Sequence, residues 1–241
     1  MNLNFNKNDL ELFVNTIWSN DFASNNGGMG APDLFTFWFI LKTYQPKVVI
    51  ESGVWNGIST KLIRKTLPYS KIICLDPRNI PESGYKDNNI NTEYYLGNNF
   101  IDFKNLDLSK YNVDDIICFF DCHQNAYLRL KQCIEKKIYK IFLNDNYPVH
   151  CGSHYTISHL INNDNRLYNI DNESKEKLLK LFQNYHIFPN IYPGDIKTGE
   201  GYFKCDSYFT NEDINTNHNN IDIFIDERNK YRWNTFISLY H

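Results

Sequence analysis

The sequence predicts a doubly wound α/β fold, with a mostly parallel sheet and helices on both faces. Three observations predict it. Short, continuous apolar runs recur along the chain, segments with helical spacing of apolar residues separate them, and several of the runs end in an acidic residue. Continuous apolar strands are typical of a parallel sheet that helices cover on both faces.

The first half of the chain follows this alternation closely. Helices are expected at 9–18 and at 32–44, where Pro32 and Asp33 suit a first helical turn. After these, apolar runs predict strands at 47–51, 71–76, 92–97, 114–121 and 140–145, with helices expected at 59–67 and 126–137. This alternation of strands and helices along the chain is typical of a Rossmann-like fold.

The C-terminal part is less regular. The segment 176–185 has the apolar spacing of a helix, whereas 221–227 and 234–240 are expected to be late strands. With 241 residues and 42% hydrophobic content, the chain can bury one full core. We therefore expect a single domain over 1–241, with residues 1–45 as a helical N-terminal addition.

Charge and composition limit the classes of partner. A net charge of −3 gives no basic field for nucleic acid or an anionic membrane. The N-terminal sequence does not resemble a secretory signal, and no apolar stretch has the length of a membrane span. The six cysteines include no C-x-x-C pair and are expected to be reduced thiols. These features favour a cytoplasmic protein, with a homodimer as a further expectation, that acts on a small molecule.

Polar residues close four of the predicted strands. Glu51, Asp76 and Asp121 end three of them, and Asn144, Asp145 and Asn146 close a fourth. In an open parallel sheet the ligand crevice lies outside the carboxyl ends of the strands. These side chains are therefore expected to converge on one edge of the sheet.

The turn "ESGVWNGIST" joins the first strand to a helix. Gly53 permits a sharp turn, and Gly57 is expected to let a ligand approach the helix start without meeting a Cβ atom. The helix N-terminus and the hydroxyls of Ser59 and Thr60 suit a carboxylate or a phosphate, and Asp76 suits a ribose diol. A tight turn without any ligand is the alternative.

Glu51 distinguishes between cofactors. A dinucleotide pyrophosphate prefers G-x-G-x-x-G, and this turn lacks the middle glycine. An acidic residue suits a ligand with an ammonium group, and S-adenosylmethionine has one, together with a carboxylate and a ribose.

An ordered set of motifs over residues 45–160 resembles the class I S-adenosylmethionine-dependent methyltransferases, and more narrowly their metal-dependent catechol O-methyltransferase-like branch. The set is "VVIESGVWNGIST", Asp76, "LGNNF", "FFDCHQN" and "NDNYP". The resemblance implies that the cofactor is held by these residues: Glu51, Gly53, Gly57 and Ser59 at the methionine end, Asp76 at the ribose, and Asn98 and Asn99 beside the adenine.

The same resemblance implies a magnesium site at Asp121, Asp145 and Asn146. Their oxygen atoms are ligands that Mg²⁺ prefers, and the ion would leave positions for neighbouring hydroxyls of a substrate. The alternative is that Asp121 caps a helix and that Asp145 and Asn146 form a turn before Pro148.

The catalytic base departs from the family pattern. Gln124 stands where catechol-type enzymes have a lysine, which leaves His123 and, less directly, His154 as candidate bases. The acceptor is then expected to be a hydroxylated small molecule, a sugar or a polyphenol. The Gly- and Asn-rich segment 19–32 is expected either to close over the ligands or to be a plain connection.

Three functions stay open at this point. The first is a metal-assisted O-methyltransferase that uses S-adenosylmethionine. The second is an NAD(P)-dependent oxidoreductase on the same sheet, which the missing glycine disfavours. The third is a non-catalytic protein that retains the cofactor pocket, which the change from lysine to Gln124 keeps open.

Overall fold

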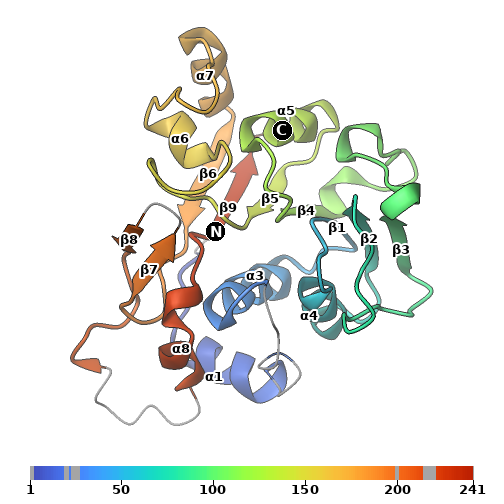
Figure 1. The fold of residues 1–241 in the computed structure, drawn as a ribbon. Coiled ribbons are helices and arrows are strands. Elements are labelled where there is room, and N and C mark those ends of the chain that lie inside the picture. The colour runs from blue at the N-terminus through green and yellow to red at the C-terminus, as the bar shows by residue number, and fades with distance from the viewer. Residues whose placement is uncertain (1–2, 19–21, 23–27, 199–200, 214–220, 241) are drawn as a thin grey trace.

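A computed structural model describes residues 3–18, 22, 28–198, 201–213 and 221–240. A seven-stranded sheet crosses the molecule (Figure 1), in the order β3-β2-β1-β4-β5-β9-β6. In chain order the strands are β1 (Val48–Ser52), β2 (Lys71–Asp76), β3 (Thr92–Leu96), β4 (Ile116–Phe120), β5 (Lys140–Leu143), β6 (Phe182–Ile187) and β9 (Thr235–Leu239).

The strand directions confirm the predicted doubly wound sheet. The pairs β1–β2, β2–β3, β1–β4 and β4–β5 are all parallel, and β9 is antiparallel to both β5 and β6. The chain moves outward from β1 to β3 and then crosses back to place β4 on the other side of β1. The gap between β1 and β4 is the point where a sheet of this kind binds its ligands.

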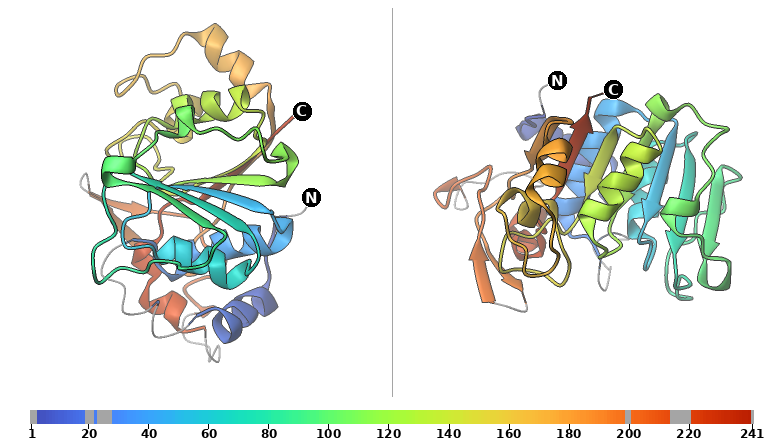
Figure 2. Two further views of the ribbon diagram at one scale, coloured as in Figure 1. Left: turned by 90° about the vertical axis from the view of Figure 1, so that its right-hand side faces the viewer. Right: turned by 90° about the horizontal axis from the view of Figure 1, so that it is seen from above.

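Helices cover both faces of the sheet, as the left view of Figure 2 shows. The N-terminal helices and α4 cover one face, and the helices that follow β4 and β5 cover the other. The helices are α1 (Lys7–Thr16), α3 (Ala31–Tyr44), α4 (Ile58–Thr66), α5 (Ala126–Glu135), α6 (Ile157–Ile161), α7 (Asn172–Leu179) and α8 (Ile223–Asp226).

Strand alternation divides the apolar side chains into two cores. Val49 and Phe119 face α3 and α4, whereas Ile50 and Phe120 face α5. On the first face Phe37 of α3 stacks on Phe119, with ring centroids 4.3 Å apart. Helix α3 of the N-terminal addition therefore packs directly on the sheet, and α1 packs on α3 through Phe13.

Two C-terminal predictions were wrong. The expected helix at 176–185 is α7 followed by β6, because the residues from Phe182 onward pair with β9. The expected strand at 221–227 contains α8, whose Phe224 and the preceding Ile221 are buried at helical spacing. Both segments are short apolar runs, which fit either period.

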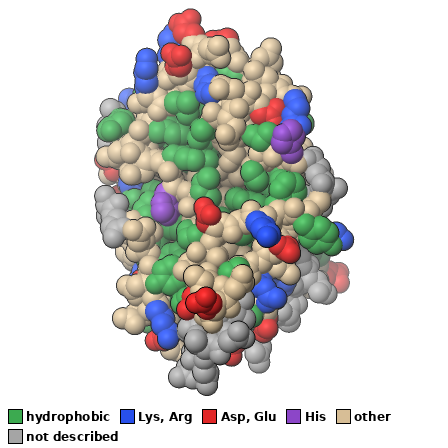
Figure 3. Space-filling view, turned by 90° about the vertical axis from the view of Figure 1, so that its left-hand side faces the viewer, with side chains coloured by type: hydrophobic (Ala, Val, Ile, Leu, Met, Phe, Trp, Pro, Cys, Tyr) green, Lys and Arg blue, Asp and Glu red, His purple; other side chains and the backbone are tan. Residues whose placement is uncertain are grey.

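A small hairpin, β7 (Asp195–Thr198) and β8 (Gly201–Lys204), is separate from the main sheet. On the face drawn in Figure 3, the basic side chains of the described residues are scattered among acidic, polar and hydrophobic ones. Within the described ranges, no helix combines the length and the apolar character needed to cross a bilayer.

Candidate active site

Two neighbouring clefts open at the carboxyl ends of β1, β2, β4 and β5. The larger, of about 530 Å³, includes Asp121, His123 and Asp145 in its lining. The smaller, of about 470 Å³, extends over Asp76. Gly53, Arg78 and His123 line both, so the clefts meet above the gap between β1 and β4. Both volumes lie within the usual range for small-molecule sites.

The two glycines of the first turn have different neighbours. Gly53 has φ +97°, and a Cβ atom there would lie 2.3 Å from the carbonyl oxygen of Asp121, so the glycine lets two strand ends meet. Gly57 has φ +75°, and its Cβ atom would lie 2.1 Å from the carbonyl oxygen of Tyr85. The space predicted for a ligand at Gly57 is therefore filled by the chain itself.

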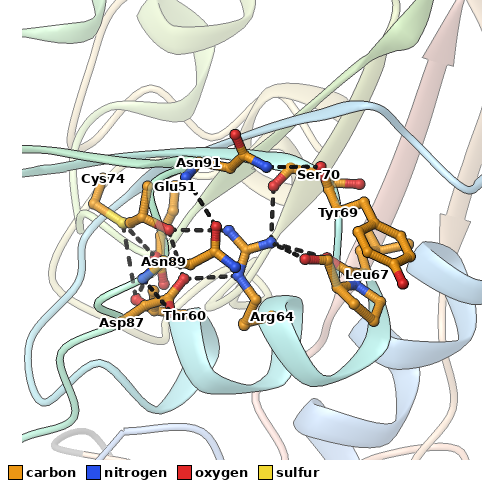
Figure 4. Close-up of polar contacts among 12 residues, drawn as sticks. Glu51, Thr60, Arg64, Leu67, Tyr69, Ser70, Cys74, Asp87, Asn89 and Asn91 are labelled. Atoms are coloured by element: carbon orange, nitrogen blue, oxygen red, sulfur yellow. Dashed lines mark hydrogen bonds and ion pairs between the residues drawn. The ribbon is translucent and has the colours of Figure 1, made fainter.

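Glu51 and Ser59 contact each other beneath the turn. The buried Glu51 carboxylate accepts a hydrogen bond from the hydroxyl of Ser59. It also accepts from the hydroxyl of Thr60, at 2.6 Å, and from the Cys74 thiol (Figure 4). Burial raises the pKa of Glu51 to about 7. Neither Glu51 nor Ser59 lines the two clefts. Their positions fit a structural link between β1, α4 and β2 better than the predicted contact with a cofactor.

An ion pair holds the segment that covers the start of α4. Arg64 of α4 donates to Asp87 at 2.7 Å, and both side chains are largely buried. Asp87 also accepts a hydrogen bond from Thr92 of β3. The amide of Tyr85 donates to the carbonyl oxygen of Asn56 at 2.8 Å. These contacts fix the Tyr85 carbonyl over the helix N-terminus.

Glu51→Gln is expected to change the pH dependence of stability. Because the folded carboxyl has a pKa of about 7 against an ordinary 4.5, its stabilising contribution is full below pH 4.5 and is lost as the pH rises through 7. The limiting slope is about 1.4 kcal/mol per pH unit. Urea unfolding at pH 5, 6 and 7 should show the variant gaining stability relative to wild type as the pH rises. Equal slopes would contradict this, and Glu176→Gln, on the exposed surface, is the control.

Asp76 organises the turn and faces the smaller cleft. Its carboxylate accepts from the amides of Val54 at 2.9 Å, Trp55 at 3.1 Å and Arg78 at 2.8 Å. Burial would raise the pKa of Asp76, but these N–H groups outweigh it and the pKa is lowered. The Arg78 side chain, which is 60% exposed, lies 3.2 Å from the carboxylate. A ribose diol that bound Asp76 would replace this arginine contact.

The far wall of the smaller cleft contains residues that the sequence did not indicate. Arg129 of α5 forms two hydrogen bonds with Asp102, at 3.0 and 2.9 Å, and both residues line the cleft together with Phe100. The predicted Asn98 and Asn99 lie in the exposed 3₁₀ turn after β3 and line neither cleft. The only signal for Arg129 in the sequence was a basic residue placed among the apolar residues of the predicted helix 126–137.

Asp121, His123 and Asp145 form a cluster in the larger cleft. One ligand atom from each lies within 4.8 Å of the others. His123 Nε2 is 3.1 Å from Asp145 Oδ2 and 3.7 Å from Asp121 Oδ1. His123 and Asp145 have φ values of +51° and +56°, in the left-handed region. Non-glycine residues with such values are uncommon and concentrate at functional sites.

The two carboxylates of the cluster need a compensating positive charge or a proton. Burial raises the pKa of Asp121 well above its usual range, and the neighbouring Asp145 raises it further. The hydrogen bond to Asp145 raises the pKa of His123. Burial would raise the pKa of Asp145, but the contact with His123 outweighs it and lowers the value. Two carboxylates held this close repel each other unless a proton, an imidazolium or a metal ion lies between them.

The side chain of Asn146 is hydrogen-bonded to other groups, so its contacts give less support to the predicted role as a metal ligand. Its side-chain amide donates to Tyr185 at 2.9 Å and to Thr235 at 2.8 Å, and its side-chain oxygen accepts from the amide of Ser158 at 3.1 Å. Asn146 is buried and lines the larger cleft at no point. The left-handed backbone at Asp145 redirects the residues that follow β5, which the sequence pattern does not reveal.

Asn144 takes the position expected of Asn146. It lines the larger cleft, and its amide nitrogen donates to Asp121 Oδ1 at 3.1 Å. Its side-chain oxygen is buried and has no hydrogen-bond partner among the described residues. An unpartnered buried oxygen beside two carboxylates fits a site that can hold a cation.

His154, the second candidate base, lies behind the cluster. Its ring centroid is 5.5 Å from that of His123, and burial lowers its pKa to about 4. Its Nδ1 has no hydrogen-bond partner among the described residues. His154 is therefore a neutral imidazole at physiological pH.

Part of the segment 19–32 also borders the larger cleft, through Phe22, Gly28 and Met29. Residues 19–21 and 23–27 lie outside the described residues. The predicted closure of this segment over the ligands stays a prediction.

No family model matches the chain, and no curated protein does. Among solved structures, it aligns with an O-methyltransferase from Bacillus cereus in complex with S-adenosylhomocysteine (SAH), at 11% identity and a TM-score of 0.49, over 96% of this chain and 90% of that one. The methyltransferase PaMTH1 of Podospora anserina, bound to SAH, gives 11% and 0.40, with coverages of 84% and 87%.

MycE, a methyltransferase of the mycinamycin biosynthetic pathway in complex with Mg and SAH, gives 17% identity and a TM-score of 0.42, over 83% of this chain and 54% of that one. TM-scores below 0.5 carry no functional assignment, so the function is inferred from the residues of this chain.

Proposed function

We propose that this chain is an S-adenosylmethionine-dependent O-methyltransferase that acts on a hydroxylated small molecule, a sugar or a polyphenol, with a divalent cation held by Asp121, His123 and Asp145. The observation that carries the proposal is the junction of the two clefts at Gly53 and His123. A donor over Asp76 and an acceptor beside the carboxylates would meet there.

The smaller cleft fits the cofactor by its chemistry. Asp76 offers a charged acceptor to ribose hydroxyls at its inner wall. Asp102, held by Arg129 at the far wall, offers an acceptor to an adenine amino group. The bound cofactor supplies an electrophilic methyl group on a sulfonium. The protein has to hold the acceptor oxygen in line with that group and make it nucleophilic.

The cluster fits a divalent cation by its donor set. Carboxylates suit Mg²⁺ and Mn²⁺, and an imidazole ligand extends the set toward Fe²⁺ and Zn²⁺. A bound cation stabilises a deprotonated hydroxyl. His154 lines neither of the two clefts, and burial lowers its pKa to about 4, so it is the weaker of the two candidate bases. Without a cation, the His123–Asp145 pair is itself a candidate base, and activity in excess chelator distinguishes these two mechanisms.

The geometry gives less support to the nicotinamide alternative. A dinucleotide pyrophosphate binds at the start of the helix after the first strand. Here the Tyr85 carbonyl occupies the approach to Gly57. Trp55 stands where the fingerprint has its second glycine.

Asp76→Asn is expected to weaken SAH binding by about 1–3 kcal/mol, because the ribose loses a charge-assisted acceptor. The asparagine oxygen can still accept from the amides of Val54 and Trp55, so the fold should persist. Calorimetric titration with SAH measures the change, and Asp107→Asn, at an exposed turn, is the control. An unchanged dissociation constant would remove Asp76 from the cofactor site.

A cytoplasmic location, a homodimer and the absence of nucleic-acid and membrane partners stay predictions.

A further inference from the structure

We infer that the acceptor carries an anionic group, a carboxylate or a phosphate, which binds Arg232 and Lys230 while its hydroxyl lies at the Asp121–Asp145 cluster. The inference rests on the proposed function and names its class of substrate. Arg78, Lys230 and Arg232 line the same 530 Å³ cleft as the cluster. The cleft therefore has an acidic end and a cationic wall.

Arg232 is the cation with the weakest compensation. Its guanidinium donates to the carbonyl oxygens of Asn229 at 3.2 Å and Tyr231 at 2.9 Å. No carboxylate of the described residues forms an ion pair with it. Two uncharged carbonyls leave part of the guanidinium fork free for a carboxylate or a phosphate, which it matches in geometry.

The nearest acidic side chain does not neutralise Arg232. Asp33 accepts from the backbone amide of Arg232 at 3.0 Å and is fully buried at the start of α3. Burial raises its pKa to about 8, so it is mostly protonated at neutral pH. This contact fixes the backbone at Arg232 and leaves the positive charge of the side chain in place.

Lys230 lines the same wall, and the carboxylate that it pairs with, Glu227, also accepts a hydrogen bond from a backbone amide. Its ammonium lies 2.7 Å from Glu227 Oε1, and the other oxygen of Glu227 accepts from the first amide of α3, at Ala31, at 2.6 Å. The Lys230 side chain is half exposed. The ammonium can therefore contact a ligand without leaving Glu227.

A divalent cation at the cluster would strengthen this asymmetry. It would compensate the charges of Asp121 and Asp145, and cations would then outnumber anions along the remaining lining. A cleft of one dominant sign attracts and orients ligands of the opposite sign. Tyr147 lines the same cleft.

The test is calorimetric binding of matched acceptors to the full chain in saturating SAH and Mg²⁺. One arm compares 3,4-dihydroxybenzoate with catechol, and the other compares glucose 6-phosphate with glucose. At least one acidic probe is expected to bind ten-fold or more tightly than its neutral partner. The arm in which this occurs identifies carboxylate or phosphate.

Arg232→Gln and, separately, Lys230→Gln are expected to lower the affinity for the acidic probe about ten-fold and to leave SAH and the neutral probe unchanged. Arg166→Gln, an arginine paired with Asp164 outside the clefts, is the control. Equal binding of acidic and neutral probes, a preference that survives both variants, or no acidic probe binding to a protein that binds SAH would each overturn the inference. If the wild-type protein does not bind SAH, the proposed function is contradicted instead.

Discussion

Asp145→Asn is expected to reduce methyl transfer by at least about 10²–10³-fold while the protein stays folded, because the change removes one charged ligand from the cation and the main partner of His123. The backbone at Asp145 is left-handed, at φ +56°, and asparagine adopts that conformation readily. The substitution therefore changes charge without changing the turn.

The readouts are SAH production, SAH affinity and the unfolding midpoint. Affinity for SAH is expected to stay within a few-fold, because the cation contacts the acceptor more than the cofactor. Chelation of wild type should reproduce the loss of activity. Asp115→Asn, which removes a surface partner of Lys47, is the control. Full activity of the variant or of chelated wild type would contradict the metal assignment. His123 and His154 would then be the remaining candidates for the catalytic base.

Gly57→Ala is expected to lower the free energy of unfolding by about 3 kcal/mol. A left-handed conformation costs a non-glycine residue about 1–2 kcal/mol, and displacing a packed neighbour costs about 1–3 kcal/mol. Here the neighbour is the Tyr85 carbonyl, 2.1 Å from the new Cβ atom. For a chain of this size the unfolding midpoint should fall by about 6–12 °C.

Gly201→Ala is a comparison variant with backbone strain and no collision. Gly201 also has a positive φ, of +137°, but a Cβ atom there meets nothing within 4 Å. It should therefore show the backbone cost alone. If Gly57→Ala keeps its stability and loses SAH binding, the glycine faces the cofactor as the sequence suggested, and the Tyr85 carbonyl does not cover the helix start.

The sequence predicted the sheet and the meeting of Asp121 with Asp145 because both depend on local patterns. Continuous apolar runs set the parallel strands, and the carboxyl ends of parallel strands share one edge. The pairing of β1 with both β2 and β4 then places the strand-end residues around one gap. The presence of His123 beside the two carboxylates did not follow from that rule.

Side-chain direction after a strand depends on backbone geometry that composition does not reveal. Asp145 turns left-handed, so Asn144 faces the cleft and Asn146 bonds to Tyr185 and Thr235. His123 was singled out as a base, and its left-handed backbone places it on the two carboxylates. Asp and His are among the residues that adopt this region most often, which is the only local signal.

Contacts between distant segments were also beyond the sequence pattern. The Arg64–Asp87 pair brings Tyr85 over the start of α4, and this changes the meaning of Gly57. Lys230 and Arg232 follow α8, which replaces the strand expected at 221–227. Their place in the cleft depends on the packing of α8 and α3, which only the fold provides.

Thermal unfolding of wild type with SAH and with NADH, each alone, tests the central claim most directly. A ligand at 100 times its dissociation constant adds about 2.7 kcal/mol to the stability of the native state, or about 5–10 °C in the midpoint for a chain of this size. The cofactor site over Asp76 predicts that SAH raises the midpoint by this amount and that NADH leaves it unchanged. A rise with NADH and none with saturating SAH would contradict the assignment of this chain as a methyltransferase.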